Sequence, residues 1–272
     1  MIVVSADAVY RLDYGQVIEE HLEAEADVTM VTTEVDPEDA GRYGVVQAGD
    51  GRIREYVYKP EEPKGNLISN EVFAFRPAAL LDTLDELADE QGADELEDLG
   101  SELLPRLVDR GTAREHRFTG YWRDVGTIPA YWEAHQELLA EEPPIDLDDP
   151  DWPILTRGAR RRAGARILGG GVVEQSLLAA ASTIGGSVQR SVIGRGVVVE
   201  AGATVRDSVL LPGAIVRAGA TVDRAILDDE VEVSVGATVG EPDGDITLVG
   251  CQAVVPEGGS VPAGGRLPEQ ED

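Results

Sequence analysis

Residues 192–227 read VIGRGVVVEAGATVRDSVLLPGAIVRAGATVDRAIL, and this stretch repeats an apolar pattern every six residues. Two rows at this spacing hold aliphatic or β-branched side chains: Val192, Val198, Thr204, Leu210, Val216 and Val222 in one, and Val197, Ala203, Val209, Ile215, Thr221 and Leu227 in the other. A six-residue period is the signature of a parallel β-helix, in which each short strand forms one side of a coil. A run of β-hairpins would place its turns about 8–12 residues apart. The stretch therefore predicts a left-handed parallel β-helix of hexapeptide repeats.

A third row, Ile193, Val199, Val205 and Leu211, stays apolar until Arg217 interrupts it, which predicts a shift of register near Pro212-Gly213. The glycine-rich texture extends over residues 165–262 and marks the predicted β-helix. Residues 263–272 follow as a predicted acidic tail. Residues 141–164 begin with an acidic run that holds Pro143, Pro144 and Pro150, which is typical of a linker.

Residues 1–140 have a different pattern and predict an α/β domain. Strands are expected at 2–4, 28–33, 44–46, 53–58 and 72–75, and helices at about 14–25, 77–90, 101–110 and 127–140. The turn Gly49-Asp50-Gly51 between two of these strands is a hairpin signal. Strands that alternate with helices favour a mainly parallel sheet, here with few strands and an open edge.

Composition excludes several classes of function. The formal net charge is −29, and Lys59 and Lys64 are the only lysines. Such a surface repels nucleic acid and anionic membranes, so neither is an expected partner. No apolar run is long enough to span a bilayer, and no export signal is visible, so the expected location is the cytoplasm. One cysteine, Cys251, excludes an internal disulfide framework and a cysteine-rich zinc site.

Two aspartates are candidate metal ligands. Asp7 follows the first predicted strand, at the end where open α/β sheets place ligand groups. Asp124 lies in Tyr121-Trp122-Arg123-Asp124-Val125-Gly126-Thr127, where it could hold a divalent metal against phosphate oxygens. The simpler interpretation of an aspartate before Val-Gly-Thr is a turn residue.

Several strings resemble one enzyme family, in the same order along the chain. Residues 5–14 are similar to S-G-D-H-x-Y-x-x-D-Y, Tyr58-Lys59-Pro60 to E-K-P, and Asp98-Leu99-Gly100 to D-F-G. Residues 120–127 match G-Y-W-x-D-V-G-T without change, and residues 152–154 resemble W-P-I. The family is glucose-1-phosphate adenylyltransferase, which has a C-terminal left-handed β-helix.

The resemblance implies a reaction of ATP with glucose 1-phosphate that gives ADP-glucose and pyrophosphate for bacterial glycogen synthesis. It implies that Asp7 and Asp124 hold a catalytic Mg²⁺ and that Lys59 holds the sugar phosphate. Ser69 and Asp98 would bond sugar hydroxyls, and Trp122 would wall the pocket. The simpler alternatives are a surface lysine, a helix-capping aspartate and a core tryptophan. The family also implies a homo-oligomer, a tetramer, whose subunits meet through the β-helix.

The chain departs from the family pattern at positions that bear on its activity. Tyr58 replaces the family's Glu, Phe73 its Tyr and Leu99 its Phe, so the exact sugar stays open. The family's phosphate-cradling loop, G-G-x-G-x-R-L, has no counterpart before Asp7, so we expect this chain to be the C-terminal two-thirds of such an enzyme.

Three alternatives stay open. One is a non-catalytic subunit or remnant that serves assembly and regulation. Another is a related nucleotidyltransferase for a different sugar or base. The third, a β-helix acyltransferase, is disfavoured because His21, His116 and His135 all precede the repeat.

Overall fold

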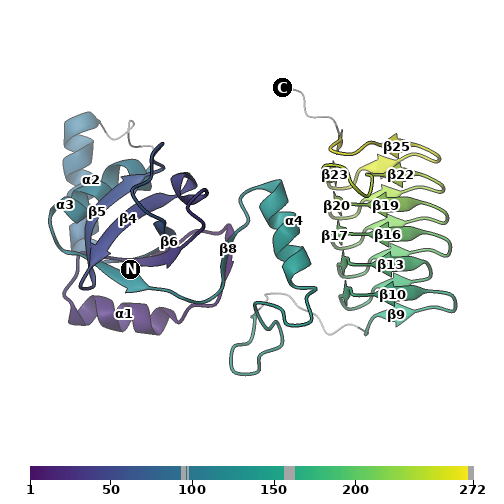
Figure 1. The fold of residues 1–272 in the computed structure, drawn as a ribbon, viewed down its shortest axis with the longest axis horizontal. Coiled ribbons are helices and arrows are strands. Elements are labelled where there is room, and N and C mark those ends of the chain that lie inside the picture. The colour runs from purple at the N-terminus through teal and green to yellow at the C-terminus, as the bar shows by residue number, and fades with distance from the viewer. Residues whose placement is uncertain (93–95, 97, 156–162, 269–272) are drawn as a thin grey trace. The chain divides into compact units, whose positions relative to one another are not determined.

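A computed structural model describes residues 1–92, 96, 98–155 and 163–268. The chain divides into two compact units, Met1–Arg123 and Asp124–Asp272 (Figure 1). The prediction placed the domain boundary after residue 140. The difference arises because the helix that begins at Ile128 packs on the β-helix and so belongs to the second unit.

The first unit is built on a six-stranded sheet with the strand order β1-β6-β3-β7-β5-β4, and β4 also pairs with β6. Its strands are β1 (Ile2–Val4), β3 (Val28–Glu34), β4 (Gly44–Gly49), β5 (Arg52–Tyr58), β6 (Leu67–Phe75) and β7 (Ala113–Arg117). A separate short pair joins β2 (Ala8–Tyr10) to β8 (Trp122–Asp124). The short strands β2, β7 and β8 were not predicted, whereas the β4–β5 hairpin is confirmed.

The prediction of a mainly parallel sheet is wrong. Of the six strands, only β3 and β7 run parallel as neighbours, and the other paired strands are antiparallel. Parallel neighbours need a crossover of about a dozen residues or more. The connection from β4 to β5 is the short turn Asp50-Gly51, and a turn of this length joins antiparallel strands.

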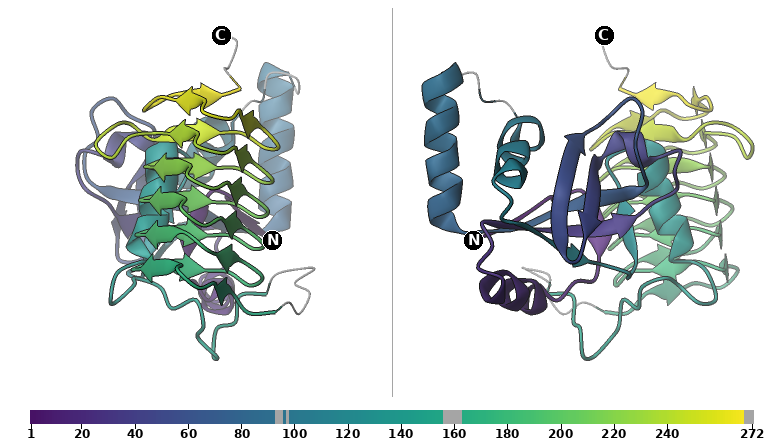
Figure 2. Two further views of the ribbon diagram at one scale, coloured as in Figure 1. Left: turned by 90° about the vertical axis from the view of Figure 1, so that its right-hand side faces the viewer. Right: turned by 60° about the vertical axis from the view of Figure 1, so that its left-hand side comes forward.

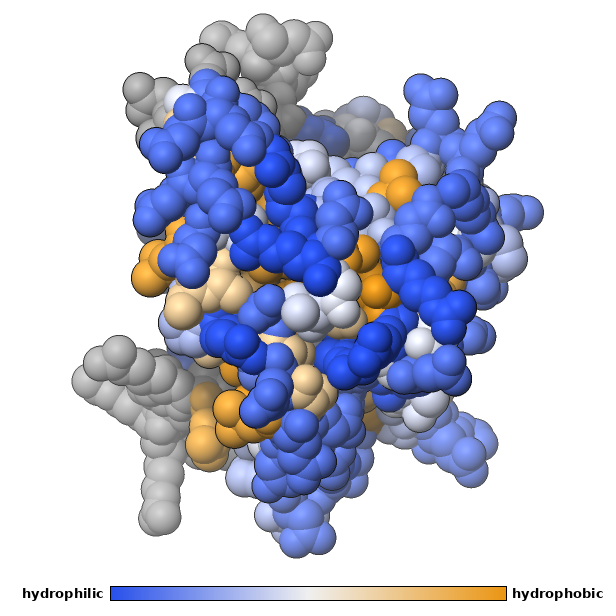
Figure 3. All heavy atoms as spheres, turned by 90° about the vertical axis from the view of Figure 1, so that its left-hand side faces the viewer, coloured by the Kyte–Doolittle hydropathy of each residue, from blue (hydrophilic) through white to orange (hydrophobic). Residues whose placement is uncertain are grey.

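Helices cover both faces of this sheet, because successive side chains of its central strands point to opposite faces and both sets are apolar. Met30 packs with Leu80 of α2 (Pro77–Gln91) and with Leu107 of α3 (Leu104–Asp109). The adjacent Val31 packs with Val17 of α1 (Tyr14–Glu23) on the opposite face. A π-helical segment, Leu99–Leu103, leads into α3, and a 3₁₀ turn, Ala40–Arg42, precedes β4. Hydrophilic side chains cover most of the molecular face shown in Figure 3, in keeping with the high net charge.

The second unit contains three parallel six-stranded sheets that form the predicted β-helix, with its coils stacked in register (Figures 1 and 2). One sheet holds β10 (Val172–Glu174), β13 (Ser187–Gln189), β16 (Thr204–Arg206), β19 (Thr221–Asp223), β22 (Thr238–Val239) and β25 (Ser260–Val261). A second holds β11 (Leu177–Leu178), β14 (Val192–Ile193), β17 (Val209–Leu210), β20 (Ala225–Leu227), β23 (Thr247–Val249) and β26 (Arg266–Leu267). The third holds β9 (Arg166–Ile167), β12 (Thr183–Ile184), β15 (Val198–Val199), β18 (Ile215–Val216), β21 (Glu232–Val233) and β24 (Val254–Val255). Because β26 pairs with β23, the β-helix extends past the predicted start of the tail at residue 263. Residues 269–272 of that tail lie outside the described residues.

The six-residue rows do not stay on one face, and the predicted shift near Pro212-Gly213 is placed wrongly. The true shift occurs at the corner between β16 and β17, which Asp207 turns with a φ of 46°. After this corner the inward position moves from Val205 to Leu210, a step of five residues, and Leu210 is fully buried. Arg224 turns the next coil at the same corner with the same φ of 46°.

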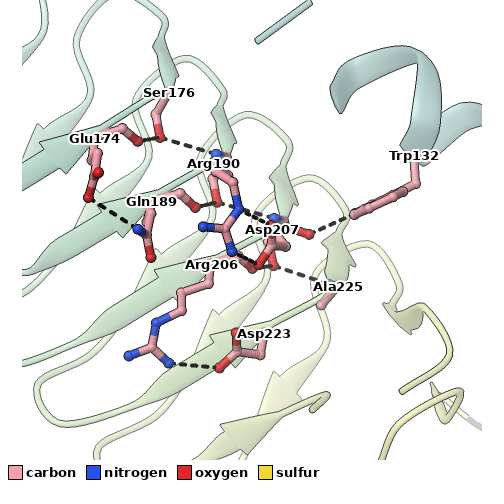
Figure 4. A network of polar contacts seen from close by, with 11 residues as sticks. Trp132, Glu174, Ser176, Gln189, Arg190, Arg206, Asp207, Asp223 and Ala225 are labelled. Carbon is pink, nitrogen blue, oxygen red and sulfur yellow. Dashed lines mark hydrogen bonds and ion pairs between the residues drawn. The ribbon is translucent and has the colours of Figure 1, made fainter. Parts of the chain in front are cut away.

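A ladder of buried serines makes this short corner possible. The backbone N–H of Ser208 donates to Oγ of Ser191 at 3.1 Å, and the N–H of Ala225 in the next coil donates to Oγ of Ser208 at 3.1 Å (Figure 4). Outside the corner, the guanidinium of Arg190 donates to both carboxylate oxygens of Asp207, at 2.7 and 2.6 Å. The ladder therefore supplies partners for backbone groups that the five-residue side leaves inside the coil.

Helix α4 (Ile128–Glu137) is anchored to the same corner. The indole N–H of Trp132 donates to the backbone oxygen of Asp207 at 2.7 Å, and the Arg224 guanidinium lies 4.4 Å from the centroid of the Trp132 ring (Figure 4). Thr127 caps the helix by accepting the Ala130 N–H.

Candidate functional site

The centre of the candidate site is a bulge in the long strand β6. Met30 pairs with Phe73 and Thr32 pairs with Ser69, so Val31 alone lies opposite the three residues Asn70–Val72. Glu71 has a φ of 60° and is, among the described residues, the one non-glycine residue inside a strand with positive φ. Bulges of this kind re-aim side chains and are common beside active sites.

Two hydrogen bonds hold the bulge in place. The N–H of Glu71 donates to Oγ of Ser69 at 3.3 Å, and the carbonyl oxygen of Glu71 accepts the N–H of Ser5 at 3.0 Å. Ser69 is 1% exposed, so its hydroxyl supports the bulge from inside the fold. The second bond ties the segment that carries Asp7 to this strand.

Tyr58 and Asp98 form a direct pair beside the bulge. The Tyr58 hydroxyl donates to Oδ2 of Asp98 at 2.8 Å, and the Gly100 N–H donates to Oδ1 at 2.6 Å. Asp98 is therefore also the helix-capping residue of the simpler interpretation. The Tyr58 ring covers Gly100 so closely that a Cβ there would overlap it. The lack of a side chain at Gly100 therefore leaves room for the Tyr58 ring.

Lys59 adds a positive charge to this cluster. Its Nζ lies 4.8 Å from the centroid of the Tyr58 ring, and its backbone has a φ of 43°. The hydrogen bond with Tyr58, together with the charges of Glu71 and Asp98, raises the pKa of the Lys59 ammonium. The lysine is a cation whose charge is favoured by the nearby carboxylates of Glu71 and Asp98.

Tyr56 completes the polar cluster from the neighbouring position of β5. Gly44 of β4 pairs with Tyr58, and the Tyr56 ring passes through the space that a side chain at Gly44 would fill. Burial, and after it the charges of Glu71, Tyr58 and Asp98, raise the pKa of the Tyr56 phenol. Tyr56 therefore stays a neutral hydrogen-bonding group.

Two buried polar groups in this region have no hydrogen-bond partner among the described residues. They are the amide of Asn70, through both its nitrogen and its oxygen, and the indole nitrogen of Trp122. Asn70 is 1% exposed, and the Trp122 ring packs edge-on against Tyr43 with centroids 5.4 Å apart. Trp122 also contacts the cluster of Ala40, Val45 and Ile68, so it is part of the core as well as a candidate pocket wall.

The two predicted metal ligands lie at the ends of a strand pair. Asp7 directly precedes β2, is exposed, and accepts a hydrogen bond from the Ser5 hydroxyl. Asp124 ends β8 and accepts the N–H of Gly126 at 3.0 Å, which is the turn geometry of the simpler interpretation. The aspartates belong to different units, so their shared metal stays a prediction. In the described ranges, no three His, Cys, Asp or Glu side chains gather as a metal-binding group.

The sequence reasoning missed Glu71, Asn70 and Tyr56. A signal was present, because the polar pair Asn70-Glu71 interrupts an apolar strand between Ile68 and Val72. Lys59, Asp98, Ser69 and Trp122, which were predicted, all lie in the first unit. Lys59 and Asp98 share a cluster around Tyr58, whereas Ser69 supports the bulge. No helix in the described part of the chain has the length and apolar character to cross a bilayer.

Comparisons with known proteins agree with this organisation. Residues 1–141 match the family model for nucleotidyl transferases, and residues 164–247 match a model described as GlmU-like, C-terminal hexapeptide. A glucose-1-phosphate adenylyltransferase of Thermomicrobium roseum is 41% identical over 65% of this chain and 41% of its own length. Those of Corynebacterium jeikeium and Streptomyces avermitilis are 36% and 38% identical, over 75% and 74% of this chain and 55% and 54% of their own lengths. The chain spans about half the length of the curated relatives it matches.

Proposed function

We propose, from the premise that this chain belongs to the nucleotidyl transferase family, that it works in the transfer of an adenylyl group from ATP to glucose 1-phosphate. The products are ADP-glucose and pyrophosphate, and the setting is bacterial glycogen synthesis in the cytoplasm. The observation that carries this proposal is the similarity to glucose-1-phosphate adenylyltransferases at 36–41% identity across both units of the chain.

In the proposed reaction a phosphate oxygen of glucose 1-phosphate attacks the α-phosphorus of ATP. A new phosphorus–oxygen bond forms, and the bond between the α-phosphorus and its bridging oxygen breaks, so that pyrophosphate leaves. Two anions must meet, and neutralising and aligning them is most of the catalysis. Lys59 suits the sugar phosphate because it is an exposed cation that lies 4.8 Å from the centroid of the Tyr58 ring, beside the polar cluster.

Asp7 and Asp124 would hold the Mg²⁺ of the reaction. Two carboxylates fit this ion, because Mg²⁺ is commonly bound by one or two carboxylates together with substrate phosphates. The exposed Asp7 carboxylate, at the end of a strand that pairs with β8, supports this assignment. The ion would supply charge neutralisation at the phosphate oxygens.

Asp98 and Trp122 would contact the sugar, and Ser69 would hold the strand beneath it. The hydrogen bonds of Asp98 to Tyr58 and Gly100 orient its carboxylate. We also propose that the chain assembles into a homo-oligomer through the β-helix, as the prediction of a tetramer implies. The exposed apolar residues Ile167, Val172 and Val254 on the β-helix support such a contact.

The test is pyrophosphate release with ATP, Mg²⁺ and a series of sugar 1-phosphates. It is run on this chain alone and on a fusion of this chain to the part of the Streptomyces avermitilis relative that lies outside the match. We expect little turnover by the chain alone and glucose-1-phosphate-dependent turnover by the fusion. Asp124→Asn in the fusion should lower kcat by orders of magnitude, and normal turnover by that variant would remove the metal role.

An assembly or regulatory subunit without activity of its own is the alternative that this assay separates. A fusion that folds but releases no pyrophosphate with any of the sugar phosphates would favour it. Light scattering on the purified chain measures the oligomer directly, and a monomer at micromolar concentration would contradict assembly through the β-helix.

A further inference from the structure

We propose that Glu71 is a specificity-determining residue whose carboxylate accepts hydrogen bonds from the sugar hydroxyls of the substrate. This inference rests on the proposed function, since it concerns the sugar 1-phosphate that Lys59 would hold. Glu71 was not among the residues that sequence motifs identified. It is assigned here from the geometry of the bulge in β6.

The backbone at Glu71 is the first observation. A left-handed conformation disfavours any residue that carries a Cβ, and glycine is the usual solution. The other non-glycine residues with positive φ lie in turns, at strand ends or at corners of the β-helix. At Glu71 a charged side chain is kept in such a conformation in the middle of a buried strand. Residues held this way cluster at ligand-binding sites, where strain serves function.

The surroundings of Glu71 are the second observation. Its charge acts on both Lys59 and Tyr56, so the carboxylate lies near the cluster that also contains Tyr58 and Asp98. Within this cluster one oxygen of Asp98 is taken by Tyr58 and the other by the Gly100 N–H. Glu71, in contrast, is half-exposed, and none of the described residues donates a hydrogen bond to its side chain. Glu71 is therefore the carboxylate of the cluster whose acceptor sites are all available to a ligand, whereas Asp98 keeps only part of its own.

The third observation concerns the neighbouring residue. The buried Asn70 amide has no partner within the described residues, and a buried polar group without a partner is costly unless a ligand or a water satisfies it. Its position beside Glu71 in the same bulge indicates that this strand segment is shaped for a polar ligand. A sugar, with several hydroxyl donors and acceptors, is a ligand of that chemistry.

Binding to the full chain tests the inference without requiring turnover. Isothermal titration calorimetry would measure the affinity for glucose 1-phosphate and for inorganic phosphate in the unaltered chain and in Glu71→Gln. We expect the substitution to weaken glucose 1-phosphate binding by about 10-fold or more, as loss of a hydrogen bond to a charged group does. Phosphate binding should stay unchanged or become tighter, because a nearby negative charge is removed.

Glu25→Gln is the matched control. Glu25 is also a glutamate with positive φ, 47°, and lies after α1, outside the cluster. It should change neither affinity. Glu71→Gly serves if Glu71→Gln fails to fold, because glycine removes the carboxylate and relieves the backbone at the same time. This variant should melt at a higher temperature than the unaltered chain and still bind glucose 1-phosphate more weakly.

The outcomes separate the two proposals. If the unaltered chain binds glucose 1-phosphate and Glu71→Gln binds it within twofold as tightly, the role of Glu71 is overturned and the proposed function stands. Equal changes for both ligands would also overturn it, since Glu71 would then act only through the charge of Lys59. If the unaltered chain binds neither ligand, the sugar-phosphate site fails, and the inference fails with it.

Discussion

Replacing Ser208 by alanine should destabilise the β-helix at one defined hydrogen bond. Oγ of Ser208 accepts the Ala225 N–H at 3.1 Å and donates to the carbonyl oxygen of Arg206. That carbonyl also accepts the Arg224 N–H at 3.1 Å and keeps this partner in the variant. The Ala225 N–H has no second partner among the described contacts, and both Ser208 and Ala225 are fully buried.

The expected cost is that of one buried N–H without a partner. Such a group costs about 1–3 kcal/mol, so we expect the free energy of unfolding of the second unit to fall by about 2 kcal/mol. Removal of the hydroxyl leaves a space in the close-packed coil that is too small for a water molecule. The loss should therefore not be compensated.

Urea unfolding followed by circular dichroism measures the change in stability, and amide hydrogen exchange of residues 221–227 locates it. Ser260→Ala is the control, since Ser260 is exposed on β25 and its hydroxyl has no hydrogen-bond partner in the described part of the chain. The control should stay within about 0.5 kcal/mol of the unaltered chain. Unchanged urea midpoint and unchanged protection of the Ala225 amide in Ser208→Ala would refute the reasoning about the ladder.

Three further predictions concern other sites. Trp132→Phe removes the N–H donor to Asp207 and weakens the contact with Arg224. The amide hydrogens of α4 should therefore exchange faster, and the free energy of unfolding of the second unit in urea should fall by about 1–2 kcal/mol. Unchanged exchange in α4 would contradict the inference that Trp132 anchors this helix to the β-helix. Asn70→Leu replaces an unpartnered buried amide by an apolar group of similar size and should raise the melting temperature, and a lower one would mean that Asn70 has a water or backbone partner. Burial lowers the pKa of His21, so below about pH 6.5 the unfolded chain binds more protons than the folded one. The free energy of unfolding should therefore decrease as the pH is lowered. His21→Gln should flatten that dependence, and an unchanged slope in urea titrations between pH 7 and 5 would exclude His21 as its source.

Much of the fold could be predicted because it depends on local patterns. The six-residue period predicts the coils of the β-helix, and Gly49-Asp50-Gly51 predicts the β4–β5 hairpin, since both follow from backbone conformations that neighbouring residues determine. The motif around Asp124 and the string Tyr58-Lys59-Pro60 pointed to the enzyme family because each is a short run of consecutive residues that can be compared directly. The spacing of apolar residues also placed α1, α2 and β3 nearly at their observed bounds.

The direction of the strands in the first unit could not be predicted in this way. Antiparallel or parallel pairing depends on which strands meet in space, and β6 meets β1, β3 and β4, whose sequence positions lie far apart. The shift of the coils at Asp207 was also misplaced. It follows from a serine in one coil that satisfies a backbone group in the next, 17 residues further along the chain.

The candidate site shows the same division. Sequence alone determined the two-part architecture and the family, and it predicted the site residues Lys59, Asp98 and Trp122, because short motifs carry them. Only the tertiary structure revealed that Tyr58 occupies an oxygen of Asp98 and that Glu71 stands in a strained bulge near Lys59. These relations join β5, β6 and the π-helical segment before α3, and they depend on how side chains from separate elements pack together.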